Sequence, residues 1–269
     1  MRDGGLRVGW RDAARDLIDG LSRRWLWTAL GWNDVRHRYL GSLLGSFWIT
    51  ASIGLMATCL TFIFAATLGT TAGYYAVYVT TGLVLWYFIQ IMLIEAATVF
   101  VGAADTIRNS AMPLSVHVLR LTWRNIIVLA HNALVVPLVL LFFQMSPSPA
   151  AWSAIPGMLL LVLNLFFASV LLGLLGARFR DIPPIVTNGM QLLFFLTPIF
   201  WLPSTLGPQR IWFVAANPLF AFIDIVRAPL IGDVVLSTSW PIVLSVTGLN
   251  LAAASLAFAA ARERVPYWI

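Results

Sequence analysis

Long apolar segments separated by short polar connections make up most of the sequence. A helix crosses the hydrocarbon core of a bilayer with about 20 apolar residues, at about 1.5 Å of rise each. Six segments meet or approach this length, and the fifth is the shortest: 43–68, 75–101, 123–145, 152–176, 185–201 and 240–261. The pattern therefore predicts an all-α integral membrane protein with six transmembrane helices.

Residues 1–42 follow a different pattern, with the period of an amphipathic helix. One face is apolar and consists of Trp10, Ala13, Ala14, Leu17, Ile18, Leu21 and Trp25. The opposite face is charged and consists of Arg11, Asp12, Arg15, Asp16 and Asp19. Trp27 and Trp32 suit an aromatic anchor at headgroup depth. We expect residues 1–42 to form an interfacial segment on the cytoplasmic surface, ahead of a membrane domain at 43–269; a helix that packs on a soluble partner is the alternative.

The connection at 202–239 is too apolar to lie in water. It contains the sequence IWFVAANPLFAFIDIVRAPLIG, interrupted near Asn217 and Pro218. We expect two short helices that dip back into the outer leaflet between spans five and six. Any irregular backbone at that depth must be shielded by protein.

The distribution of arginine predicts the orientation. Of the 17 basic residues, only Arg210 and Arg227 fall on one side of the predicted topology. The other basic residues all fall on the opposite side: in residues 1–42, in the connection between spans two and three with the start of span three, in the connection between spans four and five, and in the tail. The positive-inside rule then places both termini in the cytoplasm.

Composition agrees with a membrane protein and removes several kinds of chemistry. Hydrophobic residues make up 60% of the chain and charged residues 10%, whereas a soluble domain carries about 25% charged residues. The net charge of +6 is accounted for by cytoplasmic loops, without nucleic acid as a partner. The chain has no lysine, which excludes a phosphate-binding loop and a Schiff-base nucleophile. Any ATP must therefore be bound by a partner.

Few residues inside the predicted spans could carry chemistry. Glu95 is the one acid well within a span, where it faces a cavity or partner, or else reaches water at the cytoplasmic end. His37, His117 and His131 have no second ligand at metal-binding spacing, so no metal site is expected. The single cysteine, Cys59, lies in an apolar run that indicates packing.

Four stretches resemble the membrane subunit of ABC-2 type polysaccharide exporters, the family that carries O-antigen, capsule or teichoic acid chains. The resemblance runs through nearly the whole chain: DVRHRYLGSLLGSFW at Asp34–Trp48, YAVYVTTGLVLWYF at Tyr75–Phe88, DTIRNSAMPLSVHVLR at Asp105–Arg120 and RFRDIPPIVTNGMQLLFFLTPIFW at Arg178–Trp201. The last is the most specific, because it combines a charge cluster, spacing and Thr-Pro. The family often has lysine in its cytoplasmic segments, where this chain has arginine.

The resemblance implies a homodimer in the bacterial inner membrane, with two separate ABC ATPase subunits beneath it. The chain itself would need no cofactor, and ATP with magnesium would be bound in the partner subunit. It implies that the connection after the second span docks the ATPase, with these candidate contacts: Asp105, Arg108, Asn109 and Pro113.

The same resemblance suggests roles for three further groups. Arginine binds phosphate bidentately, so a cytoplasmic mouth could contact a lipid-linked diphosphate through Arg38, Arg178, Arg180 and Asp181; an architectural role is the alternative. Aromatic and polar residues suit a glycan path: Trp86, Tyr87, Phe88, Glu95, Phe194, Phe195, Thr197 and Trp201. An outer gate is expected at Pro198, Asn217 and Pro218.

The sequence thus predicts the permease subunit of an ATP-driven exporter of lipid-linked polysaccharide, of the O-antigen or capsule type. Teichoic acid, another lipid or a small molecule is an alternative cargo on the same fold. A proton-coupled secondary transporter would need more coupling groups in the membrane or an inverted repeat. A membrane-embedded enzyme would need a catalytic motif, and neither set of features is evident.

Overall fold

The computed structural model describes residues 9–38, 47–146, 148–207 and 211–269, and these residues form helices joined by turns and short connections. Five helices are long and apolar enough to cross a membrane, and a sixth apolar helix is shorter. The all-α membrane prediction is therefore confirmed, while six complete spans stay a prediction. The first four residues of the predicted first span, and residues 1–8 and 39–42 of the predicted N-terminal segment, lie outside the described residues.

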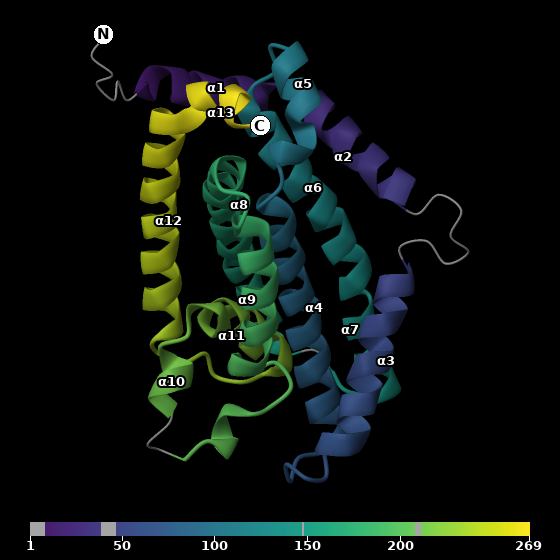
Figure 1. The fold of residues 1–269 in the computed structure, drawn as a ribbon. Helices are drawn as coiled ribbons and strands as arrows, with labels where there is room; N and C mark the ends of the chain where they lie inside the picture. Colours follow the sequence, from purple (N-terminus) through teal and green to yellow (C-terminus); the bar gives the residue numbers. More distant parts are fainter. Residues whose placement is uncertain (1–8, 39–46, 147, 208–210) are drawn as a thin grey trace.

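The helices follow the chain in this order (Figure 1): α1 Trp10–Ser22, α2 Arg24–Arg38, α3 Phe47–Phe64, α4 Ala72–Ala96, α5 Ala104–Asn109, α6 Leu114–Ala133, α7 Val135–Phe142, α8 Ala154–Arg178, α9 Ile182–Leu196, α10 Ile211–Ala215, α11 Pro218–Ile231, α12 Ser239–Ala261 and α13 Val265–Trp268.

Helix α4 lies at the centre of the membrane domain. Its side chains include the fully buried Tyr75, Phe88, Ile89 and Met92, which form the core with residues of the surrounding helices. In Figure 1, α4 runs through the middle of the bundle, with α3, α6 and α7 on one side and α8 and α12 on the other. The predicted path residues Trp86 and Phe88 belong to this core, so they pack within the chain.

Helices α6 and α7 act as one long element with a break between them. Pro137 explains the break, because it has no N–H to donate to the carbonyl of Ala133 at the end of α6. The combined element runs over Leu114–Phe142 and begins nine residues before the predicted start of span three. The added residues include a charged side chain, so the apolar run that predicted the span begins only after them.

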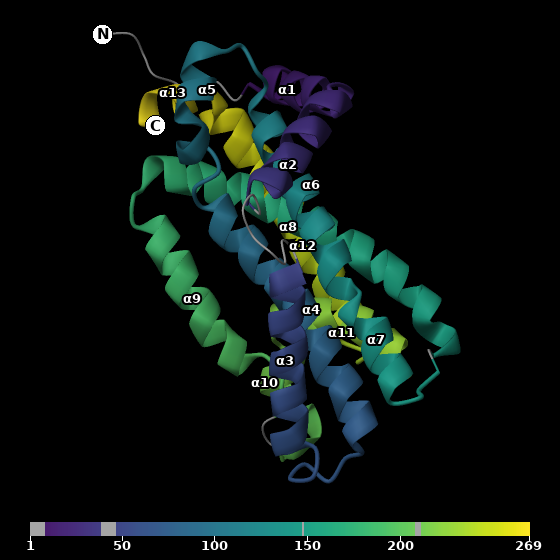
Figure 2. The ribbon, with the colours of Figure 1, turned by 90° about the vertical axis from the view of Figure 1, so that its right-hand side faces the viewer.

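Helix α9 is shorter than the predicted fifth span and begins and ends earlier. Pro183 and Pro184 occupy its first turn, where a missing N–H costs little. The helix stops at Leu196, because Thr197 precedes Pro198 and adopts an extended conformation, with φ −100° and ψ 135°. Figure 2 shows α9 standing apart from the rest of the bundle, and of its own residues only Met190 is buried.

The apolar connection between α9 and α12 folds back as two short helices, α10 and α11. The break falls at Asn217, whose side-chain Oδ1 accepts hydrogen bonds from the N–H groups of Leu219 and Phe220 at 3.0 and 3.2 Å and so caps α11. Helix α11 is buried along most of its length and contacts α4, α8 and α12. The protein thus shields this backbone, as expected for a segment at membrane depth.

Candidate functional site

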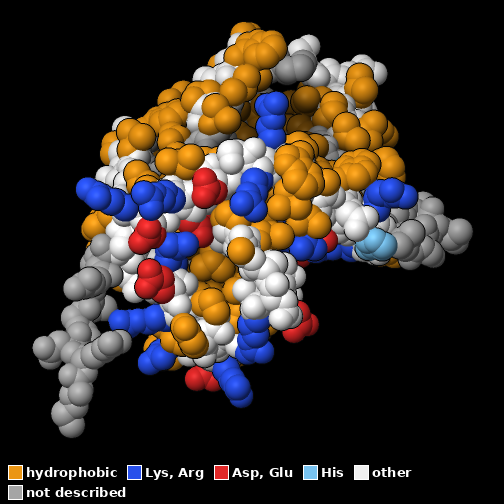
Figure 3. Space-filling model, turned by 90° about the horizontal axis from the view of Figure 1, so that it is seen from above, with side chains coloured by type: hydrophobic (Ala, Val, Ile, Leu, Met, Phe, Trp, Pro, Cys, Tyr) orange, Lys and Arg blue, Asp and Glu red, His pale blue; other side chains and the backbone are white. Residues whose placement is uncertain are grey.

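Charged side chains gather at the end of the molecule that carries α1, α5 and α13 (Figure 3). Here an acidic side chain of α1 anchors that helix to the start of α6. The carboxylate of Asp16 accepts hydrogen bonds from the backbone N–H groups of Leu114 and Ser115 at 3.0 and 2.9 Å. The Ser115 hydroxyl donates to the backbone carbonyl of Asp16 at 2.7 Å. Asp16 is 4% exposed, so this anchor is buried.

The predicted apolar face of α1 is divided, because Ala13 is buried in a small core with residues of α8 and α12, whereas other side chains of that face are exposed. Trp10, Ile18 and Leu21 are each about half exposed or more. A helix that buries Asp16 and exposes isoleucine and leucine is suited to lie against lipid. The interfacial placement of α1 stays a prediction, and the structure gives the charged face a role in packing through Asp16.

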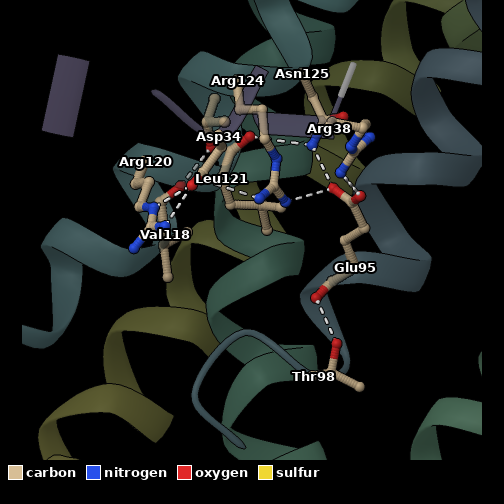
Figure 4. Close-up of polar contacts among 10 residues, drawn as sticks. Asp34, Arg38, Glu95, Thr98, Val118, Arg120, Leu121, Arg124 and Asn125 are labelled. Atoms are coloured by element: carbon tan, nitrogen blue, oxygen red, sulfur yellow. Dashed lines mark hydrogen bonds and ion pairs between the residues drawn. The ribbon is translucent and has the colours of Figure 1, made fainter. Parts of the chain in front are cut away.

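One residue network joins α2 to α4 and α6 through five ionised side chains (Figure 4). Arg124 lies between two acids, with its guanidinium 3.1 Å from Asp34 and 2.6 Å from Glu95. Arg120 pairs with Asp34, and Arg38 pairs with Glu95 at 2.5 Å. The amide of Asn125 also donates to Glu95, at 2.9 Å. We call Asp34, Arg38, Glu95, Arg120 and Arg124 the ion cluster.

The ion cluster accounts for the acid predicted inside a span. Glu95 lies in the last turn of α4, and its partners come from α2 and α6. Burial alone would raise the pKa of Asp34, but its hydrogen bonds and charge contacts with Arg120 and Arg124 hold that pKa below the usual value. Asp34 is therefore charged at neutral pH, and both acids are held by arginines in one network.

Helix α5 presents most of the predicted ATPase-docking residues at the surface. Asp105, Arg108 and Asn109 are exposed, whereas Ile107 is buried between them and Pro113 is half-buried before α6. Ile107 belongs to a small apolar core shared with Phe100, Val265 and residues of α8 and α12. The buried side chain fixes α5 and leaves its polar face open.

The residues predicted at the cytoplasmic mouth fall into two groups by their contacts. Arg38 belongs to the ion cluster. Arg178, Arg180 and Asp181 are exposed at the connection between α8 and α9. The guanidinium carbon of Arg178 lies 5.3 Å from the ring centre of Trp268, which links this connection to α13.

Aromatic residues of α9 and the following turn form a cluster. Phe194 contacts Trp86 and Phe200, with ring centres 5.8 and 5.5 Å apart. Phe195 is 65% exposed, and Tyr87 and Trp201 are partly exposed. Of the predicted path aromatics, Trp86 and Phe88 are buried, whereas Tyr87 on α4 and those on α9 and in the turn reach the surface of this chain.

The predicted gate residues meet at the other end of the molecule. The Asn217 amide donates to the Thr197 hydroxyl at 3.1 Å, which joins the end of α9 to the start of α11. Arg227 donates to the carbonyl of Pro198 at 2.9 Å, and its guanidinium carbon lies 3.8 Å from the ring centre of Tyr78.

Sequence reasoning missed Tyr78, Asp224 and Arg227. Arg227 is 2% exposed, and Asp224 accepts hydrogen bonds from the Leu236 N–H and the Ser239 hydroxyl at 2.9 and 2.6 Å. The available signal was an aspartate and an arginine three residues apart inside an otherwise apolar segment, where ionisable groups need partners.

Five long apolar helices, a further short one and the buried helix α11 define a multi-pass integral membrane protein. No family model matches the chain. Two O-antigen export system permease proteins RfbA of Klebsiella pneumoniae are each 27% identical to it, over 71% and 83% of this chain and 74% and 86% of their own lengths. The protein of the same name from Myxococcus xanthus is 24% identical over 76% of this chain and 80% of its own. The chain is therefore a distant homologue of these O-antigen export permeases. Those homologues are permease subunits and not catalytic subunits.

Proposed function

We propose that this chain is the membrane-spanning permease subunit of an ABC exporter of O-antigen polysaccharide. Similarity to O-antigen export permeases over 71% to 83% of the chain carries this proposal. The all-helical membrane fold and the lack of lysine, and thus of a phosphate-binding loop, support it. Energy would come from an ATPase subunit that binds ATP and magnesium.

The charged end of the molecule is the proposed cytoplasmic end. Arginines of α1, α2, α5 and α6 gather there, and cytoplasmic segments carry an excess of arginine and lysine. On this orientation the exposed face of α5 would meet the ATPase. Helices α10 and α11 would lie in the outer leaflet of the bacterial inner membrane, with both termini in the cytoplasm.

A homodimer is the proposed assembly, with α9 facing the path. Apolar side chains of α9 are exposed on one chain, including Ile185, Leu192 and Phe195. A second copy would cover part of this helix, and lipid or the glycan would meet the rest. The Thr197–Asn217 and Pro198–Arg227 contacts would hold the outer end of the path, and these are the proposed gate contacts.

Export is tested by deleting the gene in its host. The expected result is loss of O-antigen from the surface with lipid-linked glycan retained inside, restored by the wild-type gene. Unchanged surface glycan together with loss of another surface polymer would assign a different cargo.

Partnership is tested by purifying the tagged chain from membranes. We expect an ATPase subunit to co-purify, and Asp105→Ala and Arg108→Ala to weaken that association. Asp12→Ala is the matched control, because the Asp12 side chain is half-exposed on α1 and, among the described residues, makes a 3.7 Å surface ion pair with Arg15. A chain that purifies without any nucleotide-binding subunit in mild detergent would contradict the proposal.

A further inference from the structure

A polar pocket lies against the ion cluster, between α2, α4 and α6. Its volume is about 280 Å³, and its walls include Arg38, Arg120, Arg124 and Glu95 together with Thr98 and His117. Polar atoms therefore converge on the pocket from α2, from the end of α4 and from α6.

The charges around the pocket do not cancel. The ion cluster has three arginines and two acids, which leaves one positive charge. The side chains of these pairs are between 17% and 34% exposed, so that charge is only partly hydrated. Charge held away from water is costly unless it is paired. A single negative charge in the pocket would balance the cluster.

Two buried polar atoms beside the pocket also lack a partner. His117 is 4% exposed, and its Nε2 makes no hydrogen bond within the described part of the chain. The Nε of Arg124 likewise makes none with any described residue. Buried polar groups in native proteins nearly always have a partner. An ordered water or a bound group with hydrogen-bonding oxygens would satisfy both atoms.

The pocket lies at the depth of lipid headgroups. About 20 helical residues cross the hydrocarbon core, so a span that ends at Phe142 begins near Thr122. Thr122 lies between Arg120 and Arg124. The same count from Ala72, at the other end of α4, reaches Met92, three residues before Glu95. Both helices thus place the pocket just beyond the hydrocarbon boundary.

We propose that this pocket binds the phosphodiester of a monoanionic membrane phospholipid. One phosphodiester carries the single negative charge that the cluster lacks, and its oxygens suit the guanidinium groups and His117. A diphosphate head would bring more negative charge than the cluster can balance. The depth favours a lipid over an acidic side chain of the ATPase, which would approach from α5, nearer the start of α6. The lipid would hold α2 against α4 and α6.

This inference needs only a membrane-spanning chain, and its assignment to the cytoplasmic leaflet rests on the proposed orientation. The full chain is purified in mild detergent, with and without its ATPase, and titrated with phosphatidylglycerol during native mass spectrometry. Phosphatidylethanolamine, inorganic phosphate and farnesyl diphosphate are the comparison probes. We expect one phosphatidylglycerol per chain, bound about fivefold more tightly than phosphatidylethanolamine, because the ammonium group of phosphatidylethanolamine cancels the negative charge that its phosphodiester brings to the cluster. Neither inorganic phosphate nor farnesyl diphosphate should displace it.

Two variants probe the pocket directly. Arg38→Gln removes one positive charge from the cluster and should abolish the preference for phosphatidylglycerol. Arg264→Gln makes the same change at an exposed residue of the tail, away from the pocket, and should preserve the preference. His117→Phe fills space beside the cluster and should weaken binding about tenfold, the cost of a lost hydrogen bond to a charged group. Thermal stability in detergent verifies that each variant is folded.

Equal binding of the two phospholipids, or equal loss in Arg38→Gln and Arg264→Gln, would overturn the proposal. Displacement by farnesyl diphosphate would assign the pocket to a diphosphate, and displacement by inorganic phosphate would assign it to a free anion. Lipid binding that disappears when the ATPase is present would assign the pocket to the partner protein. A chain that binds no ATPase but retains phosphatidylglycerol would contradict the proposed function alone.

Discussion

Removal of the Asp16 carboxylate should release α1 from the membrane domain. In Asp16→Ala, the N–H groups of Leu114 and Ser115 lose their acceptor at the first turn of α6. These are donors that the helix itself cannot satisfy. Gly20 shows how closely α1 approaches here, because a β-carbon at that position would lie 2.2 Å from the Ser115 hydroxyl. Water therefore has little room to replace the carboxylate while α1 remains in place.

The expected cost follows from these contacts. A buried donor left without a partner costs about 1–3 kcal/mol, and loss of a helix cap costs about 1 kcal/mol. We expect Asp16→Ala to weaken the attachment of α1 by about 2–4 kcal/mol. The lower figure corresponds to a population of the detached state that is roughly 30-fold larger. Asp16→Asn keeps one acceptor oxygen, so the attachment of α1 should be weakened less in this variant than in Asp16→Ala.

Limited trypsin digestion measures this population, because the exposed Arg23 lies between α1 and α2 and the exposed Arg24 begins α2. When local opening is fast, the cleavage rate follows the population of the open state. We expect cleavage at this junction to be about 30-fold faster in Asp16→Ala. Asp12→Ala removes only a surface ion pair and should change the rate by less than about fivefold. Equal cleavage rates in the two variants would refute the argument that Asp16 anchors α1.

Three further predictions concern packing, capping and pH. Gly176→Ala places a β-carbon 1.8 Å from the carbonyl oxygen of Ala97, so the yield of folded protein on size exclusion should fall sharply. Gly189→Ala is the control, because Gly189 has open space around it, and it should leave the yield unchanged. Asn217→Ala removes the cap of α11 and should cost about 1 kcal/mol, read as a lower thermal midpoint; an unchanged midpoint would argue against the cap. The lowered pKa of Asp34 means that its ionised carboxylate stabilises the folded state at neutral pH. This stabilisation should be lost as pH falls below about 4, where the carboxylate takes up a proton. The thermal midpoint of Asp34→Asn should therefore fall less on acidification than that of the wild type.

Apolar length predicted the long helices well, because a membrane span has to satisfy its backbone internally and be apolar over a fixed length. Helix α12 begins one residue before the predicted span and ends at the predicted Ala261. The prediction of the fifth span was less accurate at both ends. Its apolar run continues to Trp201, but the conformational restriction that Pro198 places on Thr197 ends the helix at Leu196.

The charged contacts could not be predicted in the same way. Asp34 precedes its partners Arg120 and Arg124 by 86 and 90 positions, and only the packing of α2 on α6 brings them together. Asp16 was correctly placed on the charged face of α1. The sequence gives no sign that this one acid is buried against α6, since Asp12 and Asp19 share the same face.

The length of α9 has a consequence for the lipid around it. Its 15 residues rise about 22 Å, whereas a typical hydrocarbon core is about 30 Å thick. A bilayer that borders so short an apolar helix has to become thinner or deform beside it, at a fraction of a kcal/mol per Å of mismatch. This elastic deformation would be concentrated where α9 stands apart from the bundle. A polar polymer that crosses beside α9 would then face a thinner apolar barrier than one that crosses the unperturbed membrane.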